Sequence, residues 1–145
     1  MLLRNQQQLT LNQVETLCIE AADHYDAAAR QTSDAKLVTL FEELAEHRNR
    51  LAEELAHHIR AMDDLPQAPD PDREKADDII SAVKSFFSED TEDSLIQDRE
   101  EFEYRLAQAA QAALEQTMPQ ATMELLGRIV AHAEEARHLL SAARH

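Results

Sequence analysis

The chain is poor in the residues that interrupt helices, and this is the most informative property of its composition. Its 145 residues include one glycine, four prolines, no tryptophan, two tyrosines and four phenylalanines. Glycine and proline are the two residues least favourable in helix interiors, so their scarcity predicts an all-α protein. The single glycine, Gly127, also excludes a glycine-rich phosphate-binding loop. The length suits one domain, residues 1–145.

Cysteine and long apolar runs are equally scarce. Cys18 is the only cysteine, so no disulfide can form within the chain, which fits a reducing compartment. No run approaches the ~18 apolar residues that indicate a membrane-spanning helix, and the first ten residues lack the apolar stretch of a signal peptide. We therefore expect a cytoplasmic protein with no membrane partner.

The chain has far fewer basic residues than acidic ones. The sequence has 14 Lys and Arg against 29 Asp and Glu, which gives a formal net charge of −15 and a calculated pI near 4.7. Such a surface repels phosphate backbones, so we do not expect a nucleic-acid partner. Most charged helix faces are simply solvated, and the acidity by itself assigns no function.

What the sequence does contain is apolar residues at helical spacing, repeating every three or four positions. They predict four long helices, at about residues 7–31, 34–63, 91–117 and 119–143. The first two and the last two are closely connected, and short connections produce antiparallel hairpins. A proline-rich start and a short amphipathic helix at 72–88 make 64–90 a long crossover. Two hairpins joined by one crossover is the arrangement of a ferritin-like four-helix bundle.

A di-iron or di-manganese bundle needs inward carboxylates and two inward Glu-x-x-His motifs. The motif occurs at 54–57 and 135–138. At about 100° per residue, however, His57, Glu135 and His138 turn away from the apolar stripes of their helices and Glu54 lies on the border, so we expect both copies to be exposed. The inward face of 34–63 carries Arg48 instead, and an arginine cannot bind a metal. We therefore expect no catalytic residues and no cofactor, and we lean against an enzyme.

An alternative metal site remains open. It would hold iron or manganese through Glu103, the inward acid of 91–117, together with Glu54, His47 or His58 from the second helix. Carboxylates suit these hard cations, and histidines complete the coordination.

Four charged residues fall on the predicted inward faces: Arg48, Arg99, Glu103 and Arg137. Aligning the fourth helix with the second places Arg137 at the position of Arg48. A buried charge must be paired or it costs several kcal/mol, so we expect an ion-pair network between Glu103 and one or more arginines. Alternatively, the stems of Arg48 and Arg137 cover apolar surface while their charged heads reach water.

The first two helices carry a family resemblance. Its elements are Leu11-Asn12-Gln13-Val14, Cys18, Tyr25-Asp26-Ala27-Ala28, Asp34-Ala35-Lys36-Leu37, Leu40-Phe41-Glu42-Glu43-Leu44-Ala45, Arg48, Leu51-Ala52 and Glu54-Leu55. This combination resembles a bacterial family of ferritin-like four-helix-bundle proteins of unassigned function. The resemblance implies the fold, and an arginine where di-iron proteins have the glutamate of the second helix, but no activity. The tryptophan often found in the family's crossover is absent, and Phe86 and Phe87 are candidates to fill its volume.

Together these observations predict a non-catalytic, cytoplasmic, ferritin-like bundle of unassigned biochemical role. We interpret it as a stress- or assembly-associated interaction module that forms a homodimer or a higher homo-oligomer. The alternative function is that of a metal-binding ferritin-like protein or oxidase with a di-iron or di-manganese centre.

Overall fold

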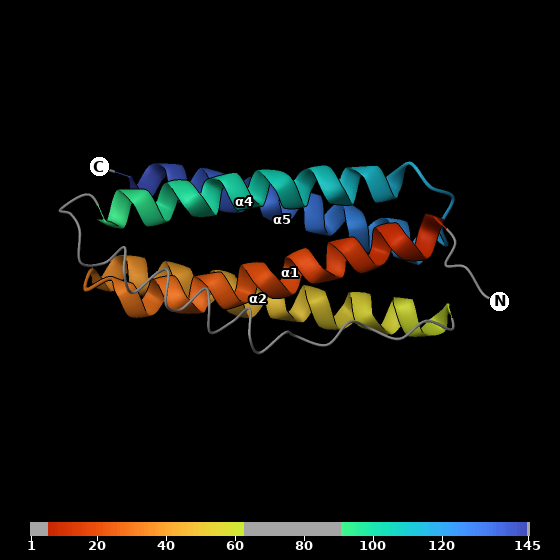
Figure 1. Cartoon of the computed structure of the whole chain (residues 1–145), viewed down its shortest axis with the longest axis horizontal. Coiled ribbons are helices and arrows are strands. Elements are labelled where there is room, and N and C mark those ends of the chain that lie inside the picture. The colour runs from red at the N-terminus through yellow and green to blue at the C-terminus, as the bar shows by residue number, and fades with distance from the viewer. Residues whose placement is uncertain (1–5, 63–90, 145) are drawn as a thin grey trace.

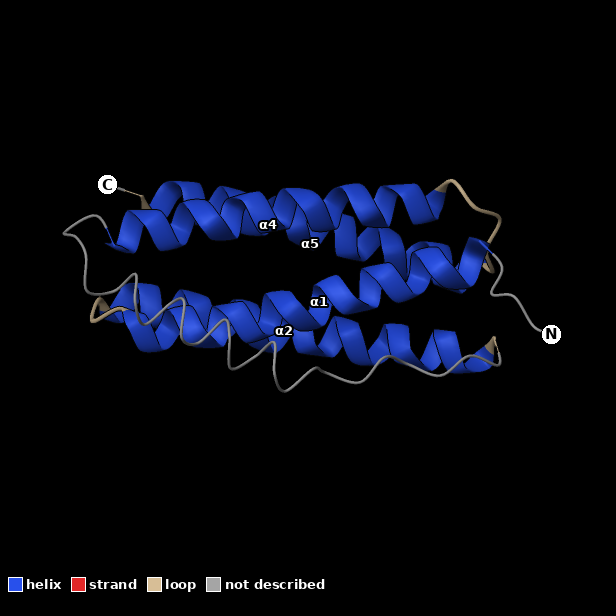
Figure 2. Cartoon of the chain, in the orientation of Figure 1, coloured by secondary structure: helices blue, strands red, loops and turns tan. Residues whose placement is uncertain are grey.

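The computed structural model describes residues 6–62 and 91–144, and all regular structure within these ranges is α-helical (Figures 1 and 2). The four helices are α1 (Gln6–Gln31), α2 (Ala35–Ala61), α4 (Thr91–Leu114) and α5 (Gln120–Ala143). The predictions of an all-α chain and of four long helices are confirmed. The largest difference in bounds is at the end of α4, predicted at 117 and observed at Leu114. The crossover and its helix at 72–88 lie outside the described residues.

The two hairpin turns explain where the helices stop and restart. Between α1 and α2, Asp34 caps α2: its Oδ1 accepts hydrogen bonds from the backbone N–H groups of Lys36 (2.9 Å) and Leu37 (3.3 Å). Thr32 Oγ1 in turn accepts from the backbone N–H of Asp34 at 3.1 Å. Such caps replace hydrogen bonds that the first helical turn cannot make internally. Pro119, with φ of −55°, directs the chain into α5 without needing an N–H partner.

The helices form a bundle in which each is antiparallel to its packed neighbours. α1 packs against α2 and α4, α5 packs against α4, and the seam between α2 and α5 is the least closely packed of the four. In Figure 1, α1 and α5 run in one direction and α2 and α4 in the other. Gln8 marks one end of the bundle, where its side chain donates to the carbonyl of Met62 at 3.0 Å. Because α2 and α4 run in the same direction, α2 ends and α4 begins at opposite ends of the bundle.

The core consists of two apolar clusters, and each draws on all four helices. The cluster nearer the start of α1 includes Leu11, Val14, Leu51, Leu55, Ile59, Leu106, Leu125, Leu126 and Ile129. The other, nearer the end of α1, includes Ala21, Ala28, Leu37, Phe41, Leu44, Leu95, Ile96, Phe102 and Leu140. Full burial of one large aliphatic side chain contributes about 1.5–3 kcal/mol, so both clusters stabilise the bundle. None of the described helices has an apolar stretch that could cross a membrane.

Candidate functional site

One polar side chain from each helix meets between the two apolar clusters. They are Tyr25 of α1, Arg48 of α2, Glu103 of α4 and His132 of α5, and all four are buried. We call these four residues the polar layer. Buried polar groups of this kind are stable only where they satisfy one another, so the geometry of the layer shows what it can do.

Arg48 and Glu103 form the centre of the polar layer. Arg48 Nη2 donates to Glu103 Oε1 at 2.7 Å, and the two side chains are 0% and 1% exposed. The other carboxylate oxygen, Oε2, accepts a hydrogen bond from the Tyr25 hydroxyl. Both oxygens of Glu103 therefore have a donor. Arg48 Nη1 is buried without a hydrogen-bond partner among the described residues, at a cost of about 1–3 kcal/mol for such a group.

Arg48 also fixes the tautomer of His132. Its Nε and Nη2 atoms lie 3.2 and 2.9 Å from His132 Nδ1. A guanidinium has donors and no acceptor, so Nδ1 must present its lone pair. In the neutral ring the hydrogen then resides on Nε2. Burial, followed by the charge of Arg48 and then by His47, lowers the pKa of His132 to about 3, so the ring is neutral at pH 7.

Tyr25 and Arg48 also keep a single protonation state near pH 7. Burial, then the charge of Glu103, raises the pKa of Tyr25 well above its ordinary value, so its hydroxyl stays protonated. Burial is the largest single influence and opposes the charge on Arg48, but the attraction and hydrogen bond of Glu103, together with Cys18 and Tyr25, outweigh it and the pKa of Arg48 is raised. Beside the layer, burial raises the pKa of the Cys18 thiol to about 12. A buried thiol of this kind is a poor nucleophile because the thiolate is the reactive form.

The donor set of the polar layer does not fit a metal ion. Both oxygens of Glu103 and the lone pair of His132 Nδ1 are engaged by Tyr25 and Arg48. A metal at His132 Nε2 would have to displace the hydrogen that the tautomer requires there. The guanidinium of Arg48 thus places a positive charge beside both the carboxylate of Glu103 and the ring of His132.

The alternative metal ligands do not come together either. Glu54 forms an exposed ion pair with Arg128 at 2.7 Å, and His58 Nδ1 lies 2.8 Å from Thr122 Oγ1. His47 packs against His132 instead of Glu103. Throughout 6–62 and 91–144, no group of three His, Cys, Asp or Glu side chains is arranged to hold a metal ion. Both Glu-x-x-His motifs have their Glu and His side chains exposed.

Two of the four residues predicted for the buried network lie outside the polar layer. Arg99 is half-buried, with Nη1 2.6 Å from His24 Nδ1 and the guanidinium 5.4 Å from the centre of the Phe102 ring. It therefore belongs to the seam between α1 and α4. Arg137 Nη1 lies 3.3 Å from Oε2 of Glu134, which is three residues earlier on α5.

The inward position predicted for Arg137 is not the one that it takes. Its side chain is 39% exposed, because α5 turns Ala133, Ala136 and Leu140 into the core. Residue 137 follows Ala136 by about 100° and therefore lies outside that stripe. The structure brings His132, and not Arg137, opposite Arg48.

Sequence reasoning missed His132 and the hydroxyl of Tyr25. His132 was detectable in principle, because with Ile129 and Ala136 it follows the spacing of three and four that marks a buried stripe. The ring of Tyr25 lies in the apolar core and is 1% exposed. A buried tyrosine hydroxyl needs a hydrogen-bond partner, and this need was the available signal, although it does not specify Glu103.

A small cavity lies between α2 and α5, beside the polar layer. Its volume is about 190 Å³, and its walls are Leu40, Glu43, Leu44, His47, His132, Glu135 and Leu139. The rings of His47 and His132 have their centres 3.9 Å apart and are tilted by 46°. Burial, then Arg50 and Arg48, lowers the pKa of His47.

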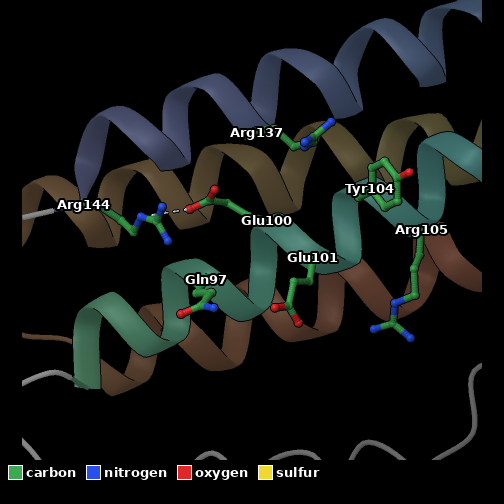
Figure 3. A pocket seen from close by; sticks show the side chains of 7 residues that line it. All are labelled: Gln97, Glu100, Glu101, Tyr104, Arg105, Arg137 and Arg144. Atoms are coloured by element: carbon green, nitrogen blue, oxygen red, sulfur yellow. Dashed lines mark ion pairs between the residues drawn. The ribbon is translucent and has the colours of Figure 1, made fainter.

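A second, open hollow of about 580 Å³ lies on the other face of α5, against α4 (Figure 3). We call it the α4–α5 groove; it is lined by Gln97, Glu100, Glu101, Tyr104, Arg105, Arg137 and Arg144. Tyr104 is 49% exposed, and the guanidinium of Arg137 lies 5.2 Å from the centre of its ring. Arg144 Nε lies 3.4 Å from Glu100 Oε1, the ion pair drawn in Figure 3.

Residues 7–116 match the model of a family described as Domain of unknown function (DUF2383). The chain belongs to this family. The matched region of this DUF2383 protein contains Tyr25, Arg48 and Glu103 of the polar layer, and His132 lies beyond it. No curated protein and no solved structure was found to match the chain.

Proposed function

We propose that this DUF2383 protein is a ferritin-like bundle that acts as a non-catalytic, cytoplasmic interaction module, with Arg48 in the position of a metal ion. The observation that carries this proposal is the buried ion pair of Arg48 with Glu103 at mid-bundle. The topology supports it, because α2 and α4 run in the same direction, and a long crossover between two hairpins characterises ferritin-like bundles.

An arginine in this position favours a structural role over a catalytic one. A metal ion in a catalytic site keeps an open coordination position for substrate or water. A guanidinium has no such position, and it stays protonated near pH 7 because its ordinary pKa lies far above that pH, so it cannot act as a general base. The polar layer instead selects which helix faces meet, since any other pairing would leave Arg48 or Glu103 buried without a partner.

The α4–α5 groove supports the interaction part of the proposal. Tyrosine and arginine are enriched among the residues that dominate binding at protein interfaces. In the groove Tyr104 and Arg105 are exposed and Arg137 is half-buried. We propose a homodimer or higher homo-oligomer in which this groove is part of the contact. Its mixture of arginines with Glu100 and Glu101 provides both signs of charge, which suits contact between two acidic copies.

Metal analysis of the purified protein tests the first part. We expect protein grown with added iron and manganese to contain neither metal in stoichiometric amount. We also expect its melting temperature to stay unchanged when either ion is added. Stoichiometric metal that disappears in Glu103→Ala would overturn the proposal and favour the metal-binding or oxidase alternative.

Light scattering coupled to gel filtration tests the second part. We expect an oligomer that dissociates in the double variant Tyr104→Ala/Arg137→Ala. The matched control is Leu9→Ala, which removes another exposed large side chain (46% exposed) from α1, outside the groove. A wild-type monomer at all concentrations would contradict the proposal, and so would equal dissociation of both variants.

A further inference from the structure

The cavity between α2 and α5 has a buried end and an open end. His132 is 7% exposed and Leu44 is 4% exposed, so these two residues form its deep part. Glu43, His47, Glu135 and Leu139 are exposed and form its mouth, with Leu40 between. A volume of about 190 Å³ corresponds to about six water molecules at roughly 30 Å³ each, the size of a small organic molecule.

His132 lines the deep part of the cavity and carries a hydrogen-bond donor that Arg48 does not face. Because Arg48 occupies the lone pair of His132 Nδ1, the hydrogen of the neutral ring is on Nε2. Nε2 makes no hydrogen bond to any side chain or carbonyl within 6–62 and 91–144. The ion pair beneath fixes this donor, because the arginine cannot accept a hydrogen from Nδ1.

The mouth of the cavity has the opposite character. Glu43 and Glu135 approach it from α2 and α5, and the leucines at 40, 44 and 139 provide apolar walls. The positive charges that act on His47 are Arg50, which is exposed, and Arg48, which Glu103 compensates. A ligand that matches these features has a cationic end toward the mouth, a short apolar body and a hydrogen-bond acceptor at its inner end.

We propose that the α2–α5 cavity binds a small organic cation that carries a hydrogen-bond acceptor, of the class of short ω-amino amides. The ammonium group lies between Glu43 and Glu135, and the acceptor receives the hydrogen of His132 Nε2. A simple anion is repelled by the two carboxylates, and a simple alkylamine leaves the donor of His132 without a partner. This inference is independent of the interaction module proposed above.

The test uses the whole protein and three probes of similar size. Binding is followed by NMR through the imidazole signals of His132. 4-Aminobutanamide has both the cation and the acceptor, pentan-1-amine only the cation, and pentanamide only the acceptor. We expect 4-aminobutanamide to bind about fivefold more tightly than either of the others. Against pentan-1-amine the difference is one net hydrogen bond of about 1 kcal/mol, and against pentanamide it is two exposed ion pairs that together contribute about 1 kcal/mol.

A fourth probe distinguishes a free ligand from a lysine of a partner protein. Nα-acetyl-lysine N-methylamide must enter with its ammonium group first, because its amides lie at the other end of the side chain. It would then bring a cation to the His132 donor. We expect weaker binding than for 4-aminobutanamide, and equal or tighter binding would overturn the proposal of a free ligand.

Matched variants test the acidic mouth. Glu43→Gln/Glu135→Gln should weaken 4-aminobutanamide binding about fivefold, as expected for the loss of two exposed ion pairs that together contribute about 1 kcal/mol, and leave pentanamide binding unchanged. The control, Glu42→Gln/Glu124→Gln, removes the same charge from exposed positions of the same helices outside the cavity. Equal weakening in both variants, or equal affinity for the first three probes, would overturn the proposal.

Discussion

Two arginine–glutamate pairs in this bundle have the same length and opposite surroundings. Arg48 and Glu103 are 2.7 Å apart with side chains 0% and 1% exposed, whereas Arg128 and Glu54 are 2.7 Å apart with side chains 58% and 47% exposed. Water screens the exposed pair, and such pairs contribute about 0–1 kcal/mol. Water cannot replace a partner in the buried pair. The comparison shows that burial, and not distance, determines how strongly the fold depends on an ion pair.

The largest difference is expected when each pair loses its arginine. Arg48→Met leaves Glu103 charged and buried, and should lower the free energy of unfolding by about 3–5 kcal/mol. Arg128→Met leaves Glu54 in water and should cost less than about 1 kcal/mol. Urea unfolding followed by circular dichroism measures both values. Losses of similar size would show that Arg48 does not pair with Glu103 in the folded protein.

Removing Glu103 together with Arg48 should recover part of the unfolding free energy that is lost in Arg48→Met. In Arg48→Met/Glu103→Leu neither charge of the buried pair remains, so we expect the free energy of unfolding to rise by about 2 kcal/mol or more above that of Arg48→Met. Recovery stays incomplete because Tyr25 and His132 lose their partners, at about 1–3 kcal/mol each. The same urea titration gives the coupling energy. A double variant less stable than Arg48→Met would contradict the ion pair.

The protonation of His132 should make the buried layer sensitive to acid. Its pKa is about 3 when folded, against an ordinary value of 6.5, so between these pH values the unfolded chain binds one more proton. The free energy of unfolding therefore falls as the pH falls from 6.5 toward 3. His132 should account for about 2 kcal/mol between pH 7 and pH 5.

His132→Gln should abolish that part of the pH dependence, and the measurement is urea unfolding at several pH values. The control is His138→Gln, at an exposed position of the same helix. The relevant quantity is the slope of the unfolding free energy against pH, compared between each variant and the wild type. The comparison removes the contribution of the carboxylates, which is common to all three proteins. Identical slopes for both variants would refute the assignment of a buried, neutral His132.

Salt should produce the smallest effect and distinguish the two pairs most directly. A double-mutant cycle measures the coupling energy between Arg128 and Glu54. We expect this energy to fall from at most about 1 kcal/mol at low salt toward zero at 1 M salt. Coupling between Arg48 and Glu103 should change little, because no electrolyte reaches a fully buried pair. Equal salt sensitivity would mean that solvent penetrates the polar layer.

The sequence predicts the helices well because apolar spacing and helix-breaking residues act locally. Arg48 was identifiable because a charged residue interrupts a stripe of large apolar side chains, Leu44 and Leu51. Glu103 was identifiable by the same reasoning on its own helix. Both are strong local signals, and neither depends on how the helices are placed relative to one another.

The rest of the polar layer depends on helix rotation, which alanines specify weakly. Ala133 and Ala136 are both buried on α5, but an alanine is compatible with either a core or a surface position. A small error in rotation therefore exchanged His132 for Arg137. The tautomer of His132 could not be predicted from sequence at all, because it depends on an arginine contributed by another helix.

The loose seam between α2 and α5 has a consequence for the motions of the bundle. Partial opening of a protein begins where the fewest contacts must be broken, so the two hairpins should separate first along this line while α1 and α4 stay together. Amide hydrogens of α5 near His132 should then exchange with solvent faster than those of α1 near Tyr25. A molecule held in the seam would contact both hairpins and slow that exchange.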